Sequence, residues 1–223
     1  DVIRSLHEIR LHSGVTFFVG ENGSGKSTLL EAIAVAWGLN PEGGSRHLQF
    51  DTRQSHSTLH EYLTLSRGVR RARDAFFLRA ESFFNVASEI ERLDEEDLPA
   101  PRIGPAYGPQ ALHEQSHGES FLSLLMNRFR GGGLYILDEP EAALSPSRQM
   151  AALARIHDLV GGGAQFIIAT HSPILMAFPG ARIYQLAEDG IAEVEYTETE
   201  HYTITKSFLN DHERMLARLL DDD

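Results

Sequence analysis

The segment with the clearest chemical potential is residues 20–27, which read GENGSGKS and fit the pattern G-x-x-x-x-G-K-[ST]. Glycines let backbone N–H groups curl around phosphates, and the N-terminus of a following helix adds partial positive charge. We expect Lys26 to reach the β- and γ-phosphates of a nucleotide and Ser27 to hold Mg²⁺. A glycine turn with a chance lysine is the alternative, which the flanking strand and helix patterns disfavour. The expected phosphate contacts are Gly20, Asn22, Gly23, Ser24, Gly25, Lys26, Ser27 and Thr28.

Two adjacent carboxylates, Asp138 and Glu139, follow the apolar stretch at residues 134–137. Residues at the carboxyl end of a parallel strand face the ligand crevice of an α/β sheet. Asp138 is therefore expected to bind Mg²⁺, directly or through water. Glu139 is expected to orient and deprotonate the attacking water. An ordinary acidic turn is the alternative, and the phosphate loop upstream makes it less favoured.

A histidine follows a second apolar stretch in the same way. Residues 166–169 are apolar, and Thr170-His171-Ser172-Pro173 comes directly after them. A histidine at this sheet edge can donate a hydrogen bond to a γ-phosphate oxygen and so report its presence. A lone histidine is more often structural, but the two preceding motifs favour a catalytic, switch-like role for His171.

A further anion site is indicated by Gln115-Ser116-His117-Gly118-Glu119-Ser120. Ser116 and Glu119 have the spacing of a capping box, which is the purely structural interpretation. The functional interpretation uses the same geometry, because a capped helix N-terminus beside a small glycine can bind an anion. No phosphate loop precedes this segment. The phosphate that Ser116, Gly118 and Glu119 would bind could therefore come from another copy of the chain.

Alternating strand and helix patterns position these motifs. The predicted strands are 15–19, 75–79, 134–137 and 165–170, with a hairpin of 182–186 and 191–196 around Asp189-Gly190. The predicted helices are 26–37, ended by Gly38; 120–130; 146–160, capped by Ser145; and a closing helix 206–220. Residues 89–110, acidic and then rich in Pro and Gly, are expected to form a surface excursion. Continuous apolar strands separated by helices predict an α/β fold with a mostly parallel sheet covered on both faces.

Composition narrows the class of protein. The chain has 223 residues, a net charge of −12 and no cysteine, which excludes disulfides and thiolate metal sites. No apolar run approaches the ~18 residues of a membrane span and the start has no secretory pattern, so a cytoplasmic protein is expected. The chain lacks an initiator Met, so an N-terminal segment could be missing. The acidic charge disfavours unaided nucleic-acid binding. The candidate basic patch, for which a solvated face is the alternative, is Arg67, Arg70, Arg71 and Arg73.

Together the four motifs resemble those of the ABC ATPase family. They occur in the family's order, phosphate loop, signature, Asp-Glu strand end and switch histidine, within roughly residues 15–175. Asp138-Glu139-Pro140 and Thr170-His171-Ser172-Pro173 are most similar to the RecF, OLD and SMC-type branch. The stretches FFLRAESFFNVA (76–87) and LHEQSHGES (112–120) are similar to those of short stand-alone bacterial ATPases.

The resemblance implies Mg²⁺-dependent ATP hydrolysis by a P-loop NTPase domain of two lobes. A RecA-like lobe would comprise about residues 1–81 and 126–223, and a small helical lobe about 82–125. The family forms head-to-tail homodimers with ATP between one phosphate loop and the partner's signature. By that likeness Ser116 and Gly118 would touch the partner's γ-phosphate. Residues 143–145 would form the D-loop that crosses the interface.

The chain also departs from the family pattern. Its signature reads SHGES and lacks the apolar first residue of the transporter-like LSGGQ. Glu81 holds about the place of the family's lobe-connecting Gln and is expected beside the metal. The sequence favours a soluble ATPase that acts as a nucleotide-driven dimerisation switch for an unknown protein partner. The alternatives are the nucleotide-binding subunit of a membrane transporter and a DNA-processing, repair or defence ATPase.

Overall fold

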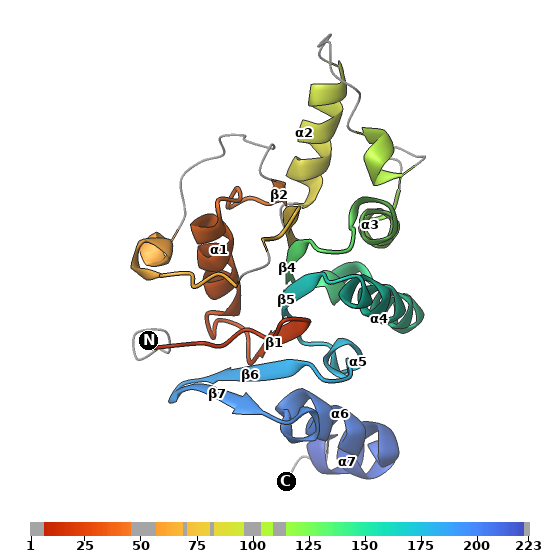
Figure 1. The fold of residues 1–223 in the computed structure, drawn as a ribbon. Helices are drawn as coiled ribbons and strands as arrows, with labels where there is room; N and C mark the ends of the chain where they lie inside the picture. Colours follow the sequence, from red (N-terminus) through yellow and green to blue (C-terminus); the bar gives the residue numbers. More distant parts are fainter. Residues whose placement is uncertain are drawn as a thin grey trace.

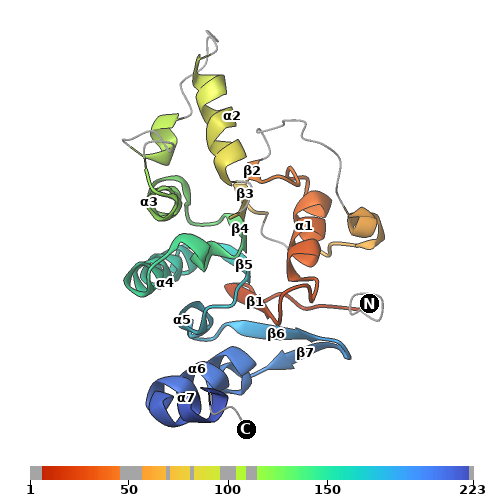
Figure 2. The same cartoon turned by 180° about the vertical axis from the view of Figure 1, so that it is seen from behind.

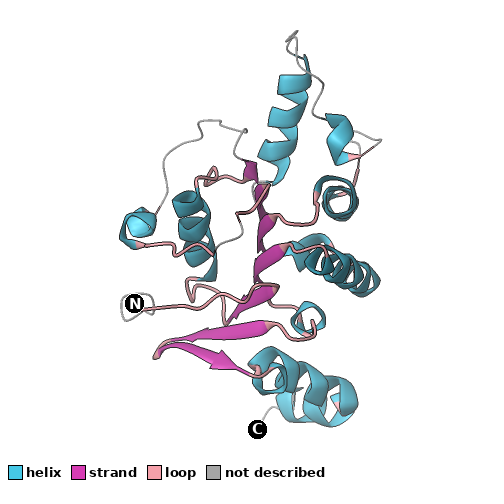
Figure 3. Ribbon diagram, in the orientation of Figure 1, coloured by secondary structure: helices cyan, strands magenta, loops and turns pink. Residues whose placement is uncertain are grey.

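A twisted, mostly parallel β-sheet runs through the molecule, with helices on both of its faces (Figures 1 and 3). The computed structural model describes residues 7–45, 57–68, 71–80, 83–95, 104–108 and 115–220. Within these residues the sheet has seven strands in the order β2-β3-β4-β5-β1-β6-β7. The strands are β1 Val15–Val19, β2 Gly44–Ser45, β3 Ala75–Arg79, β4 Leu134–Asp138, β5 Gln165–Ala169, β6 Arg182–Ala187 and β7 Gly190–Val194.

The parallel core of the sheet consists of β3, β4, β5, β1 and β6, and the antiparallel strands β2 and β7 form its edges. The central strands are buried on both faces, which explains their continuous apolar sequences. In the register, Asp138 lies opposite Arg79 on one side and Ala169 on the other. The carboxyl ends of β3, β4 and β5 therefore lie at the same edge of the sheet.

One face of the sheet is covered by α1 and the other by α3, α4 and α5, as the two opposite views show (Figures 1 and 2). Alternate strand residues supply the two cores: Phe18 packs with Leu29 and Leu30 of α1, whereas Phe17 belongs to the cluster that contains Ile156 of α4. The helices and turns described are α1 Lys26–Trp37, η2 Thr58–Tyr62, α2 Phe83–Glu95, η3 Gly104–Tyr107, α3 His117–Ser123, η5 Leu124–Arg128, η6 Pro140–Ala143, α4 Pro146–Gly161, α5 Pro173–Met176, η7 Tyr196–Glu198, α6 Glu200–Asn210 and α7 His212–Leu220.

Several predicted elements are confirmed. Helix α1 ends where Gly38 takes a left-handed conformation with φ 96°. Helix α4 begins at Pro146, and the Ser145 side chain accepts a hydrogen bond from the Arg148 N–H. The strands of the predicted hairpin pair as β6 and β7. Its turn is at Glu188 and Asp189, because Gly190 is the first residue of β7 and pairs with Ala187.

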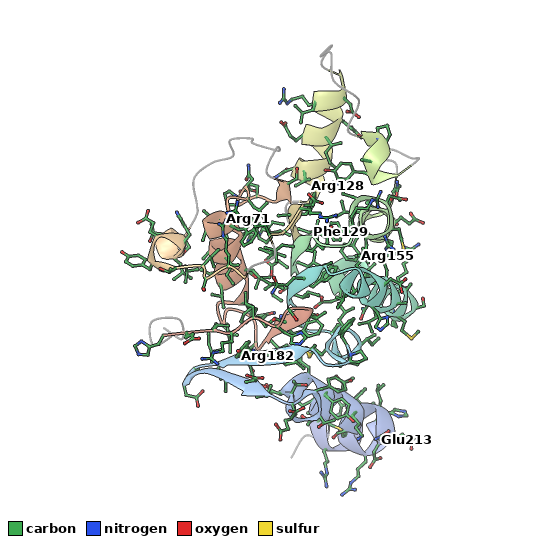
Figure 4. The ribbon with its side chains drawn as sticks, viewed as in Figure 1. Arg71, Arg128, Phe129, Arg155, Arg182 and Glu213 are labelled. Carbon is green, nitrogen blue, oxygen red and sulfur yellow. The ribbon has the colours of Figure 1, made fainter. Side chains whose placement is uncertain are left out.

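The predicted helix 120–130 is wrong in its limits and in its type. The capping box starts α3 at His117, three residues earlier, and from Leu124 to Arg128 the helix is a π-helix. The wider turn is closed by Phe129 N–H donating to Leu124 O at 3.2 Å. Arg155 of α4 donates to the carbonyl oxygens of Leu125, Met126 and Phe129, which satisfies groups at the helix end. Figure 4 shows Arg155 and Phe129 on this side of the sheet.

Two other expectations need correction. Residues 89–95 of the predicted surface excursion belong to helix α2, whose buried face includes Val86 and Ile90 and is hidden in the sequence by acidic neighbours. Tyr107, later in the same stretch, is also buried. The predicted single closing helix is two helices, α6 and α7, separated at Asp211, and Thr199 caps α6 well before the predicted start. Within the described part of the chain no helix combines the length and apolarity needed to cross a membrane.

Side chains in and next to the π-helix differ sharply in burial, which predicts different effects of mutation on stability. Phe129 is fully buried and stacks on Tyr135 with ring centroids 3.9 Å apart, whereas Met126 is 46% exposed. Phe129→Ala should lower the free energy of unfolding by about 3–5 kcal/mol because it leaves a cavity in the core. Met126→Ala, the control in the same segment, should stay within about 0.5 kcal/mol of the wild type. Urea unfolding measures both, and equal losses would contradict the packing described.

Candidate functional site

The loop between β1 and α1 is shaped by glycines in conformations that other residues rarely adopt. Gly20, Gly23 and Gly25 have φ values of 144°, 79° and 96°. Gly25 is the N-cap of α1 and supplies no side-chain cap, so the first amides of the helix are not capped by a side chain. Ser24 Oγ is buried without a hydrogen-bond partner. Loop amides, a helix N-terminus and an unpaired hydroxyl together form a cradle that suits a phosphate group.

Lys26 lies under this loop and is only 4% exposed. Its Nζ donates hydrogen bonds of 2.8 Å to the carbonyl oxygens of Gly20 and Glu21. Burial lowers the pKa of Lys26, while the nearby carboxylates of Glu139 and Asp138 act in the opposite direction. The ammonium is therefore held by neutral carbonyl groups in a partly desolvated place, where an arriving anion would interact with it strongly.

A serine and an aspartate bring two oxygen atoms together across the site. Ser27 Oγ, in the first turn of α1, donates to Asp138 Oδ1 at the end of β4, at 3.0 Å. Hydroxyl and carboxylate oxygens are ligands that Mg²⁺ accepts, so these residues fit the ion. On the other side of Asp138, Arg79 Nε lies 3.7 Å from Oδ2, and Arg79 Nη1 donates to Glu31 of α1 at 2.8 Å. Arg79 thus pairs with the Asp138 carboxylate and is itself held by Glu31.

Glu139 has an unusual backbone. Among the described residues it is the one non-glycine residue with positive φ, at 51°. Its N–H donates to Ala169 O at 3.0 Å, and Pro140 starts the turn η6 directly after it. Left-handed conformations at such residues are strained and often occur at functional sites. The turn brings Glu139 Oε1 to 3.4 Å from His171 Nε2, so the carboxylate and the histidine meet at the ends of β4 and β5.

Two further residues belong to this cluster and were missed from the sequence. Glu141 Oε1 accepts a 2.6 Å hydrogen bond from the His171 N–H, and burial raises the pKa of Glu141. The other oxygen of Glu141 is buried without a hydrogen-bond partner. His201 of α6 lies with Nε2 3.0 Å from His171 Nδ1. Glu141 could have been suspected from its place just after Glu139, but no local pattern points to His201, which is distant in the sequence.

The signature residues lie on a different element. Ser116 Oγ donates to Glu119 Oε2 at 2.6 Å, and the two residues form the predicted capping box at the start of α3. Glu119 Oε1 accepts from Arg148 of α4 at 3.2 Å, and hydrogen bonds from Ser116 lower the pKa of Glu119. In the described chain these hydrogen bonds run within α3 and to α4, apart from the cluster around Lys26. Ser116 is exposed and Gly118 is buried.

The other predicted site residues differ in burial, and some of them lie outside the described part of the chain. Asn22 is exposed and Thr28 is half-buried in the first turn of α1. Glu81 lies outside the described residues, as does Arg70 of the candidate basic patch. The structure therefore brings together Lys26, Ser27, Asp138, Glu139 and His171, and it keeps Ser116, Gly118 and Glu119 on a separate helix.

Comparisons with known proteins agree on the class of nucleotide-binding domain. Residues 3–92 match a family described as AAA domain, and residues 105–177 match a second AAA-domain family whose description names the AbiEii toxin and Type IV TA systems. The chain is 31% identical over 173 residues to the thiamine import ATP-binding protein ThiQ of Cereibacter sphaeroides, covering 70% of this chain and 69% of ThiQ. It is 31% identical over 171 residues to the cytochrome c biogenesis ATP-binding export protein CcmA of Rhodopseudomonas palustris, covering 74% and 82%.

Other relatives are much longer than the chain. The chain spans 25% of the ABC transporter G family member STR2 of Medicago truncatula, to which it is 26% identical over 184 residues. Among solved structures, the SMC head domain from Thermotoga maritima has 18% identity and a TM-score of 0.44, covering 84% of this chain and 92% of that chain. The cbiO1 structure from Clostridium perfringens has 19% identity and a TM-score of 0.49, covering 93% and 88%. These structural likenesses are distant, so the family assignment depends on the sequence relatives.

The glycine loop gives a stability prediction. A Cβ at Gly20 would overlap the Leu186 carbonyl oxygen, whereas a Cβ at Gly23 would meet nothing within 4 Å. Gly20→Ala should lower the free energy of unfolding by about 2–3 kcal/mol, because backbone must move and φ is unfavourable. Gly23→Ala, the matched control, should lose only about 1–2 kcal/mol from its left-handed φ. Thermal unfolding of the nucleotide-free protein provides the measurement. A larger loss at Gly23 would show that the loop has another shape.

Proposed function

The chain belongs to the ABC-type P-loop ATPases, and from this premise we propose that it binds and hydrolyses ATP with Mg²⁺ and that ATP joins two copies in a dimerisation switch. The observation that carries the proposal is the meeting of the Lys26 ammonium, the Ser27–Asp138 oxygen pair and the Glu139–His171 pair at one sheet edge. A cation for the phosphates, hard oxygen ligands for Mg²⁺ and a residue that positions the attacking water are the parts that enzymes use for phosphoryl transfer.

In this proposal the binding residues act on the phosphates of ATP. The amides of residues 20–27 and the Lys26 ammonium neutralise the phosphate oxygens, and Lys26 leaves its two carbonyl partners to do so. Ser27 and Asp138 would hold Mg²⁺, which would neutralise charge that develops on the transferred group. Arg79 keeps the Asp138 carboxylate oriented while it is itself held by Glu31.

Glu139 is the residue that positions the attacking water and accepts its proton in this proposal. Its carboxylate is 41% exposed, which leaves room for a water molecule, and its strained backbone holds it at the strand end. A positioned carboxylate can accept a proton from water as the water attacks the γ-phosphate. His171 Nε2 is buried without a hydrogen-bond partner, although Glu139 lies nearby, so it is free to donate to a γ-phosphate oxygen. Glu141 holds the backbone of His171 in place.

The dimer is supported by the position of the signature residues, which are not part of the cluster around Lys26. Ser116 is exposed at the capped N-terminus of α3, and α3 lies on the opposite face of the sheet from α1, which follows the phosphate loop (Figures 1 and 2). In a head-to-tail dimer, Ser116 and the backbone of Gly118 would bind the γ-phosphate held by the partner's loop. Residues 143–145, from the last residue of η6 to the N-cap of α4, would cross the interface. The γ-phosphate would then be shared by both chains.

A second candidate function is the ATP-binding subunit of a transporter. The names of ThiQ, an import protein, and CcmA, an export protein, favour it. The SHGES signature favours a switch that acts on a partner without a membrane domain. Purification of a tagged chain from its native cells, with membranes solubilised, distinguishes the two. Stoichiometric recovery with a membrane-spanning protein would favour the transporter, and recovery with a partner lacking spans would favour the switch.

Glu139→Gln should keep ATP binding and lower kcat by about 100-fold or more, because the amide cannot accept the proton from water. Lys26→Ala should weaken binding and turnover together, since the ammonium contacts ATP before and during the reaction. Phosphate release and calorimetric titration with ATP measure the two effects. Glu188→Gln, in the exposed β6–β7 turn, is the matched control and should behave as the wild type. A wild-type rate in Glu139→Gln would remove Glu139 from the role of base.

The Glu139→Gln protein should dimerise with ATP and remain monomeric with ADP, because only ATP supplies a γ-phosphate for both chains to share. Light scattering after size exclusion measures the change in mass. Adding Ser116→Arg should abolish the dimer without lowering ATP binding. Ser66→Arg introduces the same side chain at an exposed position far from the signature in sequence and serves as the control. A dimer that is equally stable without nucleotide would refute the switch.

A further inference from the structure

His171 lies between two partners, and only one of them belongs to the strand ends. Its Nε2 is 3.4 Å from Glu139 Oε1, and its Nδ1 is 3.0 Å from Nε2 of His201. His201 comes from α6, beyond the last strand of the sheet, and the two imidazole rings have centroids 5.1 Å apart. The contact between His201 and His171 therefore joins helix α6 to the histidine beside Glu139.

The two neighbours of the His171 ring favour one arrangement of its proton. Nε2 makes no hydrogen bond in the described structure, but the Glu139 carboxyl group 3.4 Å away favours a proton on this nitrogen electrostatically. A neutral His171 with a proton on Nε2 has a bare Nδ1, which accepts a hydrogen bond. His201 Nε2–H is then the donor. Burial, His171 and Lys26 all lower the pKa of His201, which favours the neutral ring that this arrangement uses.

His201 is held firmly enough to set the orientation of another ring. Thr199, the N-cap of α6, is fully buried; its hydroxyl donates to Tyr196 O at 2.8 Å and accepts from the Tyr202 N–H. Tyr196 Oη donates to Pro173 O at 2.9 Å, two residues beyond His171. The rings of Tyr196 and Tyr202 also pack together, with centroids 4.7 Å apart. These contacts anchor the start of α6 beside the segment that carries His171.

We propose that His201 is a positioning residue that fixes His171 with its proton on Nε2, aimed toward Glu139 and the place of the γ-phosphate. This inference rests on the proposed ATPase function for its consequence, but not for the tautomer, which can be tested without nucleotide. It follows that α6 is coupled to the hydrolytic site: a displacement of α6 relative to α5 withdraws the donor to Nδ1 and releases the His171 ring. Partners that hold metal-bound histidines act in the same way on ring orientation.

The first test is spectroscopic and needs no nucleotide. Long-range ¹H–¹⁵N correlation spectra at about pH 8, where histidines with ordinary pKa values are neutral, distinguish the two tautomers. The His171 signals, assigned by their loss in His171→Gln, should report a proton on Nε2 in the wild type. In His201→Leu they should change to a mixture of tautomers. A wild-type His171 with its proton on Nδ1, or a His171 spectrum unaffected by His201→Leu, would overturn the proposal.

The second test separates positioning from general structural support. His201→Leu should lower kcat for ATP hydrolysis about 10-fold or more, as loss of ring-orienting partners does elsewhere, while KM changes less than about twofold. His201→Gln, whose side-chain amide can donate from a similar position, should recover most of kcat. Tyr202→Phe, the neighbouring residue on α6, removes only the hydroxyl that accepts from Lys206 and should leave kcat unchanged.

The outcomes keep the two proposals apart. If the wild type does not hydrolyse ATP, the proposed function fails while the tautomer experiment still decides the role of His201. If the wild type is active and His201→Leu retains its kcat, the positioning role fails alone. If His201→Leu does not fold, the wild-type tautomer and the kcat of His201→Gln decide the matter: a proton on Nδ1, or a kcat in His201→Gln as low as that of a protein lacking His171, would refute the role.

Discussion

The hydrogen bond between Ser27 and Asp138 joins two elements on which every other group of the site depends. Ser27 begins α1, after the glycine loop, and Asp138 ends β4, on the far side of β5 from β1. Because parallel strands end at one edge of the sheet, this contact spans the crevice in which ligands of such folds bind. Lys26 and Glu139 are the chain neighbours of these two residues. The bond therefore fixes how far the ammonium lies from the carboxylate.

The site is electrostatically costly for the folded chain. Lys26 is buried with carbonyl oxygens as partners, Glu141 is buried with one oxygen that has no hydrogen-bond partner, and Glu139 has a strained backbone. Each of these features disfavours folding on its own, and the buried aromatic and aliphatic core on both faces of the sheet offsets them. Such local conflicts are expected at functional sites.

Outside the crevice, the ion pair between Glu119 and Arg148 links helices α3 and α4. Glu119 belongs to the capping box of α3 and also pairs with Arg148 of α4, so the exposed start of α3 is tied to the helix that follows the Asp-Glu strand end. Both groups are substantially exposed, and the ion pair alone contributes little stability. The ion pair instead helps to orient the start of α3 relative to the first turn of α4, which follows η6.

Sequence patterns alone predict the phosphate loop, the strands that end at Asp138 and just before His171, α1 with its glycine stop, and the capping box at Ser116. These features follow from short-range physics: glycine conformations, strand burial and hydrogen bonds between residues a few positions apart. Other contacts become visible only in the folded chain: Glu141 holds His171, Arg79 lies between Glu31 and Asp138, and His201 reaches Nδ1 of His171. The π-helix before Phe129 and the break between α6 and α7 belong to the same group. These features depend on how separate elements pack against one another. The residues involved are mostly distant in the sequence, so no local pattern of residue types predicts that they meet.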